Sequence, residues 1–274
     1  MRVVTLGDLL LDVVVRLEAP PASDDDVPAA IAIVPGGQAA NVAAWAAWLG
    51  AEARLVARRT DDAGGSLIAG ELGRRGVELA GPLVAGERTG TVVALVAPDG
   101  ERTMATDRGV STELRADELE PAWFECSWLH VSGYALLAEP IAEAALAAVR
   151  LARARDARVA VDLSSWSAIR AYGPDRFRAN LDAAAPDVVF ANEPEWEMVG
   201  GAYALAPTAI VKRGSRGVEV RSADGVEELQ PLEAEVVDTT GAGDALAAGF
   251  LVGGIELGLE AAARCVGALG AVPS

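Results

Sequence analysis

The chain has 274 residues, 51% of them hydrophobic, and a formal net charge of −17. This size and composition suffice to bury the core of one large α/β domain. The negative charge repels polyanions, so we expect no nucleic-acid partner. No stretch of about eighteen uncharged apolar residues occurs, so we expect neither a signal peptide nor a membrane span. The two cysteines, which lack CxxC spacing, fit a cytoplasmic protein.

Short β-branched runs alternate with alanine-rich helical segments along the chain. This alternation predicts a mainly parallel sheet with helices on both faces, built from all of residues 1–274. The expected strands are 2–6, 53–57, 127–133, 157–163 and 186–192, and the expected helices are 37–50, 63–76 and 140–156.

Two segments interrupt this rhythm, residues 11–34 and residues 88–106. The first has strand-like runs around the acidic turn PPASDDDVP, and the second reads as a hairpin about PDG. We expect them to form a small β-sheet lid. Its VVALV strand offers a surface for a homodimer, with a monomer as the alternative. The acidic run Asp24 to Asp26 is interpreted as a solvated turn rather than a cation site.

Several residues that could carry chemistry have a simpler structural interpretation. His130, the only histidine, follows an apolar strand and is expected to be structural, with local hydrogen bonds, rather than part of a Ser-His-Asp triad. Cys126 and Cys265 lie in apolar runs without CxxC spacing, which predicts buried free thiols. Trp45 and Trp48 are three residues apart on one helix, which favours packing over ligand stacking.

The segment DTTGAGD, residues 238–244, is followed by a helical stretch. Small residues at a helix N-terminus let backbone N–H groups converge on an anion, and the helix dipole adds positive potential. Asp244 would then lie beside a transferred phosphoryl group and could accept a proton. From these residues alone, a simple helix cap is an equal alternative.

The segment PGGQAAN, residues 35–41, also leads into a helix. Its paired glycines allow a ligand to approach the backbone, and Asn41 offers a donor and an acceptor to a polyol. A tight turn with a helix-facing asparagine is the alternative interpretation.

Four motifs occur in a fixed order: GGQAAN, then NEPE at 192–195, KRGSRG at 212–217, and DTTGAGD. In this combination the chain resembles the PfkB/ribokinase family of carbohydrate kinases over nearly its whole length. The resemblance implies a three-layer α/β/α sandwich with a lid, and transfer of the γ-phosphoryl group of ATP to a sugar hydroxyl with Mg²⁺ as cofactor.

The resemblance also assigns roles to the residues that match the family motifs. It implies Asp244 as the catalytic base and the amides of Gly241, Ala242 and Gly243 as an anion hole. The implied sugar-binding residues are Asp12, Gly36, Gly37 and Asn41. The implied nucleotide-binding residues are Asn192, Lys212, Gly214 and Gly217, with Asn192 and Glu195 organising Mg²⁺ through water. Lys212 stands where many members carry threonine, and could contact phosphate or form a salt bridge to a surface carboxylate.

Three features depart from the family pattern. Gln38 stands where ribokinases proper carry lysine, and Leu10 replaces a polar residue, so ribose is not the expected sugar. Asp238 and Thr240 match half of a monovalent-cation site, but GLEAAARCVGALGAVPS shows no counterpart of the other half. The sequence therefore leaves potassium activation open.

Two other functions stay open at this point. The first is a nucleoside kinase of the same fold, which would need an aromatic sandwich from Trp45 or Trp166. The second is a non-catalytic sugar- or nucleotide-binding regulator. The acceptor sugar is not predictable, because its determinants lie in lid and loop side chains such as Arg108.

Overall fold

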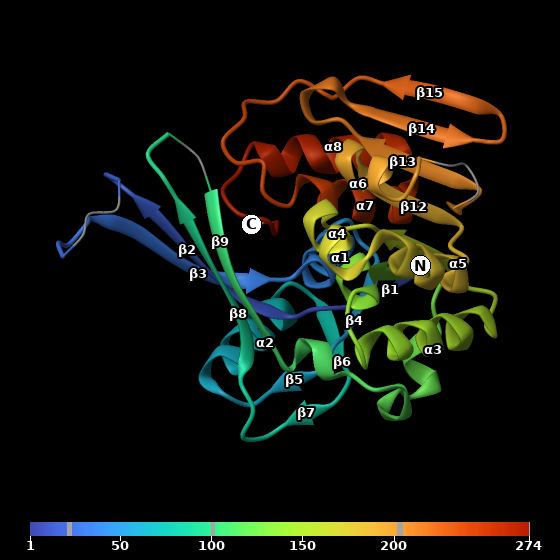
Figure 1. Ribbon diagram of the computed structural model, residues 1–274, viewed down its shortest axis with the longest axis horizontal. Coiled ribbons are helices and arrows are strands. Elements are labelled where there is room, and N and C mark those ends of the chain that lie inside the picture. The colour runs from blue at the N-terminus through green and yellow to red at the C-terminus, as the bar shows by residue number, and fades with distance from the viewer. Residues whose placement is uncertain (21–23, 100–101, 202–204, 274) are drawn as a thin grey trace.

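A nine-stranded sheet runs through the middle of the computed structural model, which describes residues 1–20, 24–99, 102–201 and 205–273 (Figure 1). In spatial order its strands are β15 (Gly225–Leu229), β14 (Val218–Ser222), β13 (Thr208–Lys212), β12 (Val188–Asn192), β11 (Arg158–Asp162), β10 (Trp128–Ser132), β1 (Arg2–Leu6), β4 (Glu52–Val56) and β6 (Val77–Ala80). All pairs from β13 to β6 are parallel, and β14 and β15 add an antiparallel hairpin. The mainly parallel sheet predicted from the sequence is confirmed.

Helices cover both faces of this sheet and so produce three layers (Figure 1). One face packs against α1 (Gln38–Trp48), α2 (Ala63–Arg74), α7 (Ala242–Gly253) and α8 (Ile255–Val266). The other packs against α3 (Ile141–Arg153), α4 (Trp166–Tyr172), α5 (Pro174–Ala184) and α6 (Glu193–Met198). Because side chains alternate along a strand, Val3 belongs to the first core and Val4 to the second.

A second sheet of four strands projects from one end of the main sheet (Figure 1). Its order is β3 (Ala29–Gly36), β2 (Leu10–Leu17), β8 (Thr89–Val96) and β9 (Arg102–Gly109). The β2–β3 and β8–β9 pairs are antiparallel, whereas β2 and β8 are parallel. A short pair, β5 (Arg59–Thr60) and β7 (Leu83–Val84), lies near its base.

The position of β8 changes one expectation about this lid. The VVALV run lies in β8, an inner strand whose backbone pairs with β2 and β9. Its edge is therefore not available to a second chain, and the outer strands are β3 and β9. The turns of both lid segments include residues 21–23 and 100–101, which lie outside the described residues. Asp24 to Asp26 are exposed, in agreement with a solvated turn.

The tryptophans of α1 differ in environment. Trp45 is buried, as expected for core packing, and its Nε1 donates to the Ala271 carbonyl oxygen at 2.9 Å. Trp48 is 41% exposed, with its ring edge-on to that of Trp45. Cys126 and Cys265 are free thiols, the first only partly buried. In the described segments, no helix is both long enough and apolar enough to cross a membrane.

Candidate active site

Four neighbouring strands of the main sheet end in polar residues on the side of the sheet that α7 and α8 cover. In β11, Ala160 packs in the core beneath α7 and α8, and side chains two residues apart point the same way. The same alternation holds in the adjacent strands. The terminal residues are Ser132 in β10, Asp162 in β11, Asn192 in β12 and Lys212 in β13. Ligands of open parallel sheets bind at this carboxyl end of the strands.

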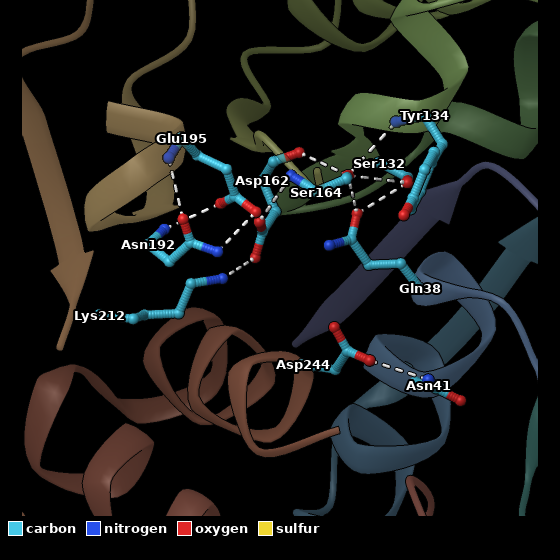
Figure 2. A network of polar contacts seen from close by, with 10 residues as sticks. All are labelled: Gln38, Asn41, Ser132, Tyr134, Asp162, Ser164, Asn192, Glu195, Lys212 and Asp244. Carbon is cyan, nitrogen blue, oxygen red and sulfur yellow. Dashed lines mark hydrogen bonds and ion pairs between the residues drawn. The ribbon is translucent and has the colours of Figure 1, made fainter. Parts of the chain in front are cut away.

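Lys212 forms an ion pair with Asp162, its Nζ donating to Oδ2 at 2.7 Å (Figure 2). Asp162 is fully buried. The salt bridge considered as an alternative for this lysine therefore exists, but its partner is a core carboxylate rather than a surface one. Burial opposes the charge on Lys212, yet Asp162 and Glu195 outweigh it and raise the pKa of Lys212. The ammonium stays charged and held at the strand ends.

Asn192 and Glu195 bind each other at the start of α6 (Figure 2). The Glu195 amide donates to Asn192 Oδ1 at 2.9 Å, and the Asn192 amide donates to Glu195 Oε2 at 2.8 Å. Asn192 Nδ2 donates to Oε1 at 2.8 Å. This capping box gives both residues a structural role. Burial raises the pKa of Glu195, opposed by Lys212 and reinforced by Asp162, so the pair belongs to the same charged cluster.

The segment predicted to bind phosphate, residues 238–244 and here called the anion turn, lies at the N-terminus of α7. Gly241, the N-cap, has φ 78° and ψ −1°, and a Cβ there would meet the backbone of Ala271 at 2.6 Å. Only glycine suits this position. First-turn amides have no acceptor within their helix, and the helix dipole makes them attractive to anions. Lys212 Nζ lies 3.2 Å from where a Cβ of Gly243 would be, so a cation adjoins the turn.

Asp244, in the first turn of α7, faces α1. Asn41 Nδ2 donates to Asp244 Oδ2 at 2.8 Å (Figure 2). Burial raises the pKa of Asp244 to about 7, with the Asn41 hydrogen bond and Lys212 opposing and the charges of Asp162 and Asp12 reinforcing the shift. A carboxyl with this pKa is suited to exchange a proton near neutral pH.

Asp12 and Asn41 each have an acceptor oxygen that finds no partner in the described part of the chain. Both Oδ1 atoms are buried and accept no hydrogen bond from the described residues. Burial raises the pKa of Asp12 to about 6. Gly36 leaves the space that the Asp12 carboxyl occupies, since a Cβ there would lie 2.1 Å from Asp12 Cγ. Gly37 has φ 95°, and a side chain there would meet the Asp8 carbonyl oxygen. Buried acceptors that lack protein donors are suited to the hydroxyl groups of a ligand.

Further polar contacts at the same edge were not predicted from the sequence. Gln38 Oε1 accepts from Ser132 Oγ at 2.7 Å and Ser164 Oγ at 2.6 Å, so its amide nitrogen turns away from the serines (Figure 2). Arg108, from the lid strand β9, donates to both carboxylate oxygens of Asp8, at 2.6 and 2.8 Å. The strand-end positions of Asp162 and Ser132 were the signal that could have identified them.

The remaining predicted residues lie outside this cluster or take no part in it. Gly214 and Gly217 form the turn between β13 and β14, where Gly217, at φ 80°, lies against the Leu229 carbonyl oxygen. His130 is buried as expected, but its ring nitrogens lack the expected local hydrogen bonds to described residues. Burial, against the influence of Asp162, lowers the pKa of His130 to about 4.

Neither of the two tryptophans considered for a nucleoside pocket is placed for an aromatic sandwich. Trp45 is buried in the core, where its indole nitrogen already has an acceptor. Trp166 is 40% exposed, with the Arg170 guanidinium 4.9 Å from its ring centroid. Neither arrangement favours an aromatic sandwich around a base.

Known structures share this arrangement. The adenosine kinase from Sinorhizobium meliloti superposes with a TM-score of 0.87 at 26% identity, covering 99% of this chain and 95% of that one. An apo structure described as a putative Ribokinase II from E. coli superposes with a TM-score of 0.87 at 20% identity, covering 98% of this chain and 94% of that one. The fold is that of the ribokinase-like kinases.

The sequence comparisons define the family. The profile described as pfkB family carbohydrate kinase matches residues 1–272, and the chain belongs to this family. The ATP-dependent ribose-1-phosphate kinase of Halopiger xanaduensis is 32% identical, with 97% of this chain and 90% of that one covered. A fructokinase of Escherichia coli is 30% identical, with 94% and 86% covered. The protein is a carbohydrate kinase, a phosphotransferase with an alcohol group as acceptor.

Proposed function

We propose that this kinase transfers the γ-phosphoryl group of ATP to a sugar hydroxyl, with Asp244 as the general base. The observation that carries the proposal is the Asn41–Asp244 hydrogen bond of 2.8 Å at the N-terminus of α7. It joins a proton-accepting carboxyl, a polar sugar contact and a helix end that attracts phosphate in one place. The name of the Halopiger relative, an ATP-dependent ribose-1-phosphate kinase, supports ATP as donor.

The acceptor is proposed to bind at Asp12, Gly36, Gly37 and Asn41. The Oδ1 atoms of Asp12 and Asn41, which accept no hydrogen bond from residues 1–20, 24–99, 102–201 and 205–273, would accept hydrogen bonds from sugar hydroxyls. Gly36 and Gly37 would shape this site, because Gly36 leaves room for the Asp12 carboxyl and Gly37 for the Asp8 carbonyl oxygen. Gln38 would donate from its amide nitrogen, because its oxygen is already used by two serine hydroxyls. A neutral donor here, rather than a lysine, disfavours strict selection for ribose.

The nucleotide is proposed to lie over the strand ends, with Lys212 against its phosphates and the turn of Gly214 and Gly217 beside it. Asn192 and Glu195 would hold Mg²⁺ through water, since both Glu195 carboxylate oxygens accept hydrogen bonds from Asn192. A magnesium ion that keeps much of its hydration shell fits this arrangement. Among the described residues, no cluster of three or more His, Cys, Asp or Glu could hold a metal directly. Mg²⁺ supplies charge neutralisation on the phosphates.

The reaction then follows from the positions of these groups. The hydroxyl oxygen of the sugar forms a bond to the γ-phosphorus, and its proton passes to Asp244. The bond from the γ-phosphorus to the β,γ-bridging oxygen breaks, and ADP departs with the electron pair. The amides of Gly241, Ala242 and Gly243 and the Lys212 ammonium stabilise the charge on the transferring group. Closure of the lid would exclude water that otherwise hydrolyses ATP.

We further propose that residues 1–274 form one kinase domain, with the lid inserted at about 11–34 and 88–106. A homodimer formed through the lid is part of this proposal, and the exposed apolar side chains of its outer strands support it: Ile31, Ile33 and Met104 are 64%, 53% and 57% exposed. Dependence on ATP and the two free thiols are in keeping with the cytoplasm.

The proposal is tested by ADP release from ATP and Mg²⁺ with a panel of ketoses, aldoses, sugar acids, sugar phosphates and nucleosides. Fructose and ribose 1-phosphate belong in the panel because relatives carry those names. Asp244→Asn should lower turnover by about 10²–10⁴-fold, while Asp182→Asn, at an exposed site on α5, should not. Equal activity of Asp244→Asn and the wild type would exclude Asp244 as the base.

A further inference from the structure

The carboxylate of Asp238, at the start of the anion turn, contacts three separate parts of the chain. Its Oδ1 accepts from the Thr240 amide at 3.0 Å and from Thr240 Oγ1 at 2.7 Å. Its Oδ2 accepts from the Gly270 amide at 3.2 Å and from Arg16 Nη2 at 3.4 Å. Asp238 is 7% exposed, so these contacts replace most of its hydration. Both oxygens are saturated by protein donors.

The charged donor in this set, Arg16, belongs to the lid. Arg16 lies in β2, the strand that also carries Asp12. Side chains four residues apart in a strand point to the same side. Arg16 and Asp12 therefore extend from one side of β2, and Arg16 connects the lid to a turn more than two hundred residues later in the chain.

A monovalent cation does not fit this arrangement. The family resemblance assigns Asp238 and Thr240 to half of a site for such a cation, which would need carboxylate lone pairs directed at the ion. Here N–H and O–H donors occupy those lone pairs, and a guanidinium already lies against Oδ2. A second cation would have to displace the arginine and withstand its repulsion.

We propose that Arg16 takes the place of a potassium ion at Asp238, so that the enzyme needs no monovalent cation and its anion turn is held by the lid. Arg16 is a positioning residue: it fixes Asp238, and Asp238 fixes Thr240 and thereby the turn that precedes Asp244. This inference rests on the proposed function, in which that turn receives the transferring phosphoryl group. The ordering of the anion turn would then depend on the lid being in place.

The test compares kcat and the KM for the acceptor found in the sugar panel, measured in KCl and in choline chloride at equal ionic strength, for the wild type and for variants of Arg16. The wild type should give the same values in both salts. Arg16→Gln should lose between about tenfold and a hundredfold in kcat in choline chloride, as a displaced catalytic turn would, and should recover part of this loss in KCl. Arg16→Lys should keep turnover in both salts. Arg88→Gln is the matched control, because Arg88 pairs with Asp107 at the base of the lid, away from the anion turn, and is 79% exposed.

Thermal stability gives a second measurement that does not require turnover. Potassium should raise the Tm of Arg16→Gln relative to choline and leave the wild type unchanged. Stimulation or stabilisation of the wild type by potassium would overturn the proposal, as would an Arg16→Gln variant that shows no response to potassium. If no acceptor is phosphorylated, the proposed function fails while the Tm comparison still decides the role of Arg16.

Discussion

Asn41 and Asp244, 203 residues apart in the chain, are joined by a hydrogen bond of 2.8 Å. The bond connects the first helix of the chain to α7, and these helices pack against each other on one face of the main sheet. Burial destabilises the charged form of Asp244, and the Asn41 donor stabilises it. The two residues together therefore set the pH range in which Asp244 can accept a proton.

The first prediction concerns the pH dependence of turnover. Because the pKa of Asp244 is raised to about 7, part of the enzyme carries a protonated base at neutral pH. We expect kcat/KM for the acceptor to rise with pH through about 7 and to level off above it. Initial rates at saturating ATP between pH 5.5 and 9 measure this rising limb of the pH profile. A profile that stays flat down to pH 5.5 contradicts the role of Asp244.

The same shift predicts a change in stability. The folded-state pKa of Asp244 lies above its usual value of 3.8, so the folded state binds more protons than the unfolded state between about pH 4 and 7. The stabilisation from the protonated form is lost as pH rises through 7. Asp244→Asn should therefore be more stable than the wild type at pH 8, by at least about 1 kcal/mol, roughly the free energy of one pKa unit. Urea denaturation at several pH values between 4 and 8 tests this, with a gain that grows as pH rises from about 4 to 7 and levels off above.

The second prediction concerns Asn41. Asn41→Leu removes the donor to Asp244 Oδ2 while keeping a similar volume. The charged form of Asp244 loses a stabilising hydrogen bond, so the rising limb of kcat/KM should move to higher pH. KM for the sugar should also increase if Asn41 contacts it. Asn180→Leu, at a site where Nδ2 donates to the Leu136 carbonyl, controls for loss of an unrelated hydrogen bond. If the rising limb of kcat/KM stays at the same pH in Asn41→Leu, the Asn41 hydrogen bond does not influence the pKa of Asp244.

The third prediction concerns the Lys212–Asp162 ion pair. Asp162→Asn leaves the Lys212 ammonium without its 2.7 Å partner beside a buried site, and should lower the free energy of unfolding by about 3–5 kcal/mol. Adding Lys212→Met should restore much of this stability, because the buried ammonium without its partner is then removed. The double variant should nevertheless have low activity, since Lys212 is proposed to contact phosphate.

The control for this prediction is an exposed ion pair. Glu52→Gln breaks the contact between Arg2 and Glu52, which is 68% exposed, and should cost less than about 1 kcal/mol. Equal losses for Asp162→Asn and Glu52→Gln would show that the buried pair has no special role in stability.

The order of strands and helices was predictable because it follows from local patterns. Residues 157–163 form a short β-branched run, as expected for a strand covered on both faces, and β11 runs Arg158–Asp162 with every residue after Arg158 buried. Asp162 also ends that strand at the edge where ligands bind, so its position could have been recognised. Its pairing with Lys212 could not, because it depends on the order in which β11, β12 and β13 lie side by side.

The contacts between the lid and the main sheet were beyond any local pattern. Arg108 pairs with Asp8, and Arg16 with Asp238, only because the lid sheet is held at a particular angle to the main sheet. That angle arises from packing, not from the spacing of residues in β2 or β9. Arginines are also common in this chain, which weakens any inference from their number.

The fourth prediction separates two glycines of the anion turn. Gly241→Ala would place a residue with φ 78° against the backbone of Ala271, at 2.6 Å, and should lower the free energy of unfolding by about 1–3 kcal/mol. Gly243→Ala meets only side-chain atoms of Lys212, the nearest being Nζ at 3.2 Å, and alanine favours a helix over glycine. Gly243→Ala should therefore fold at least as well as the wild type but lose kcat, because its methyl group crowds the ammonium beside the transferring phosphoryl group. Urea denaturation and steady-state kinetics on both variants distinguish the two effects. Loss of stability in Gly243→Ala equal to that in Gly241→Ala would mean that the first turn of α7 lacks the space for phosphate that the proposed reaction requires.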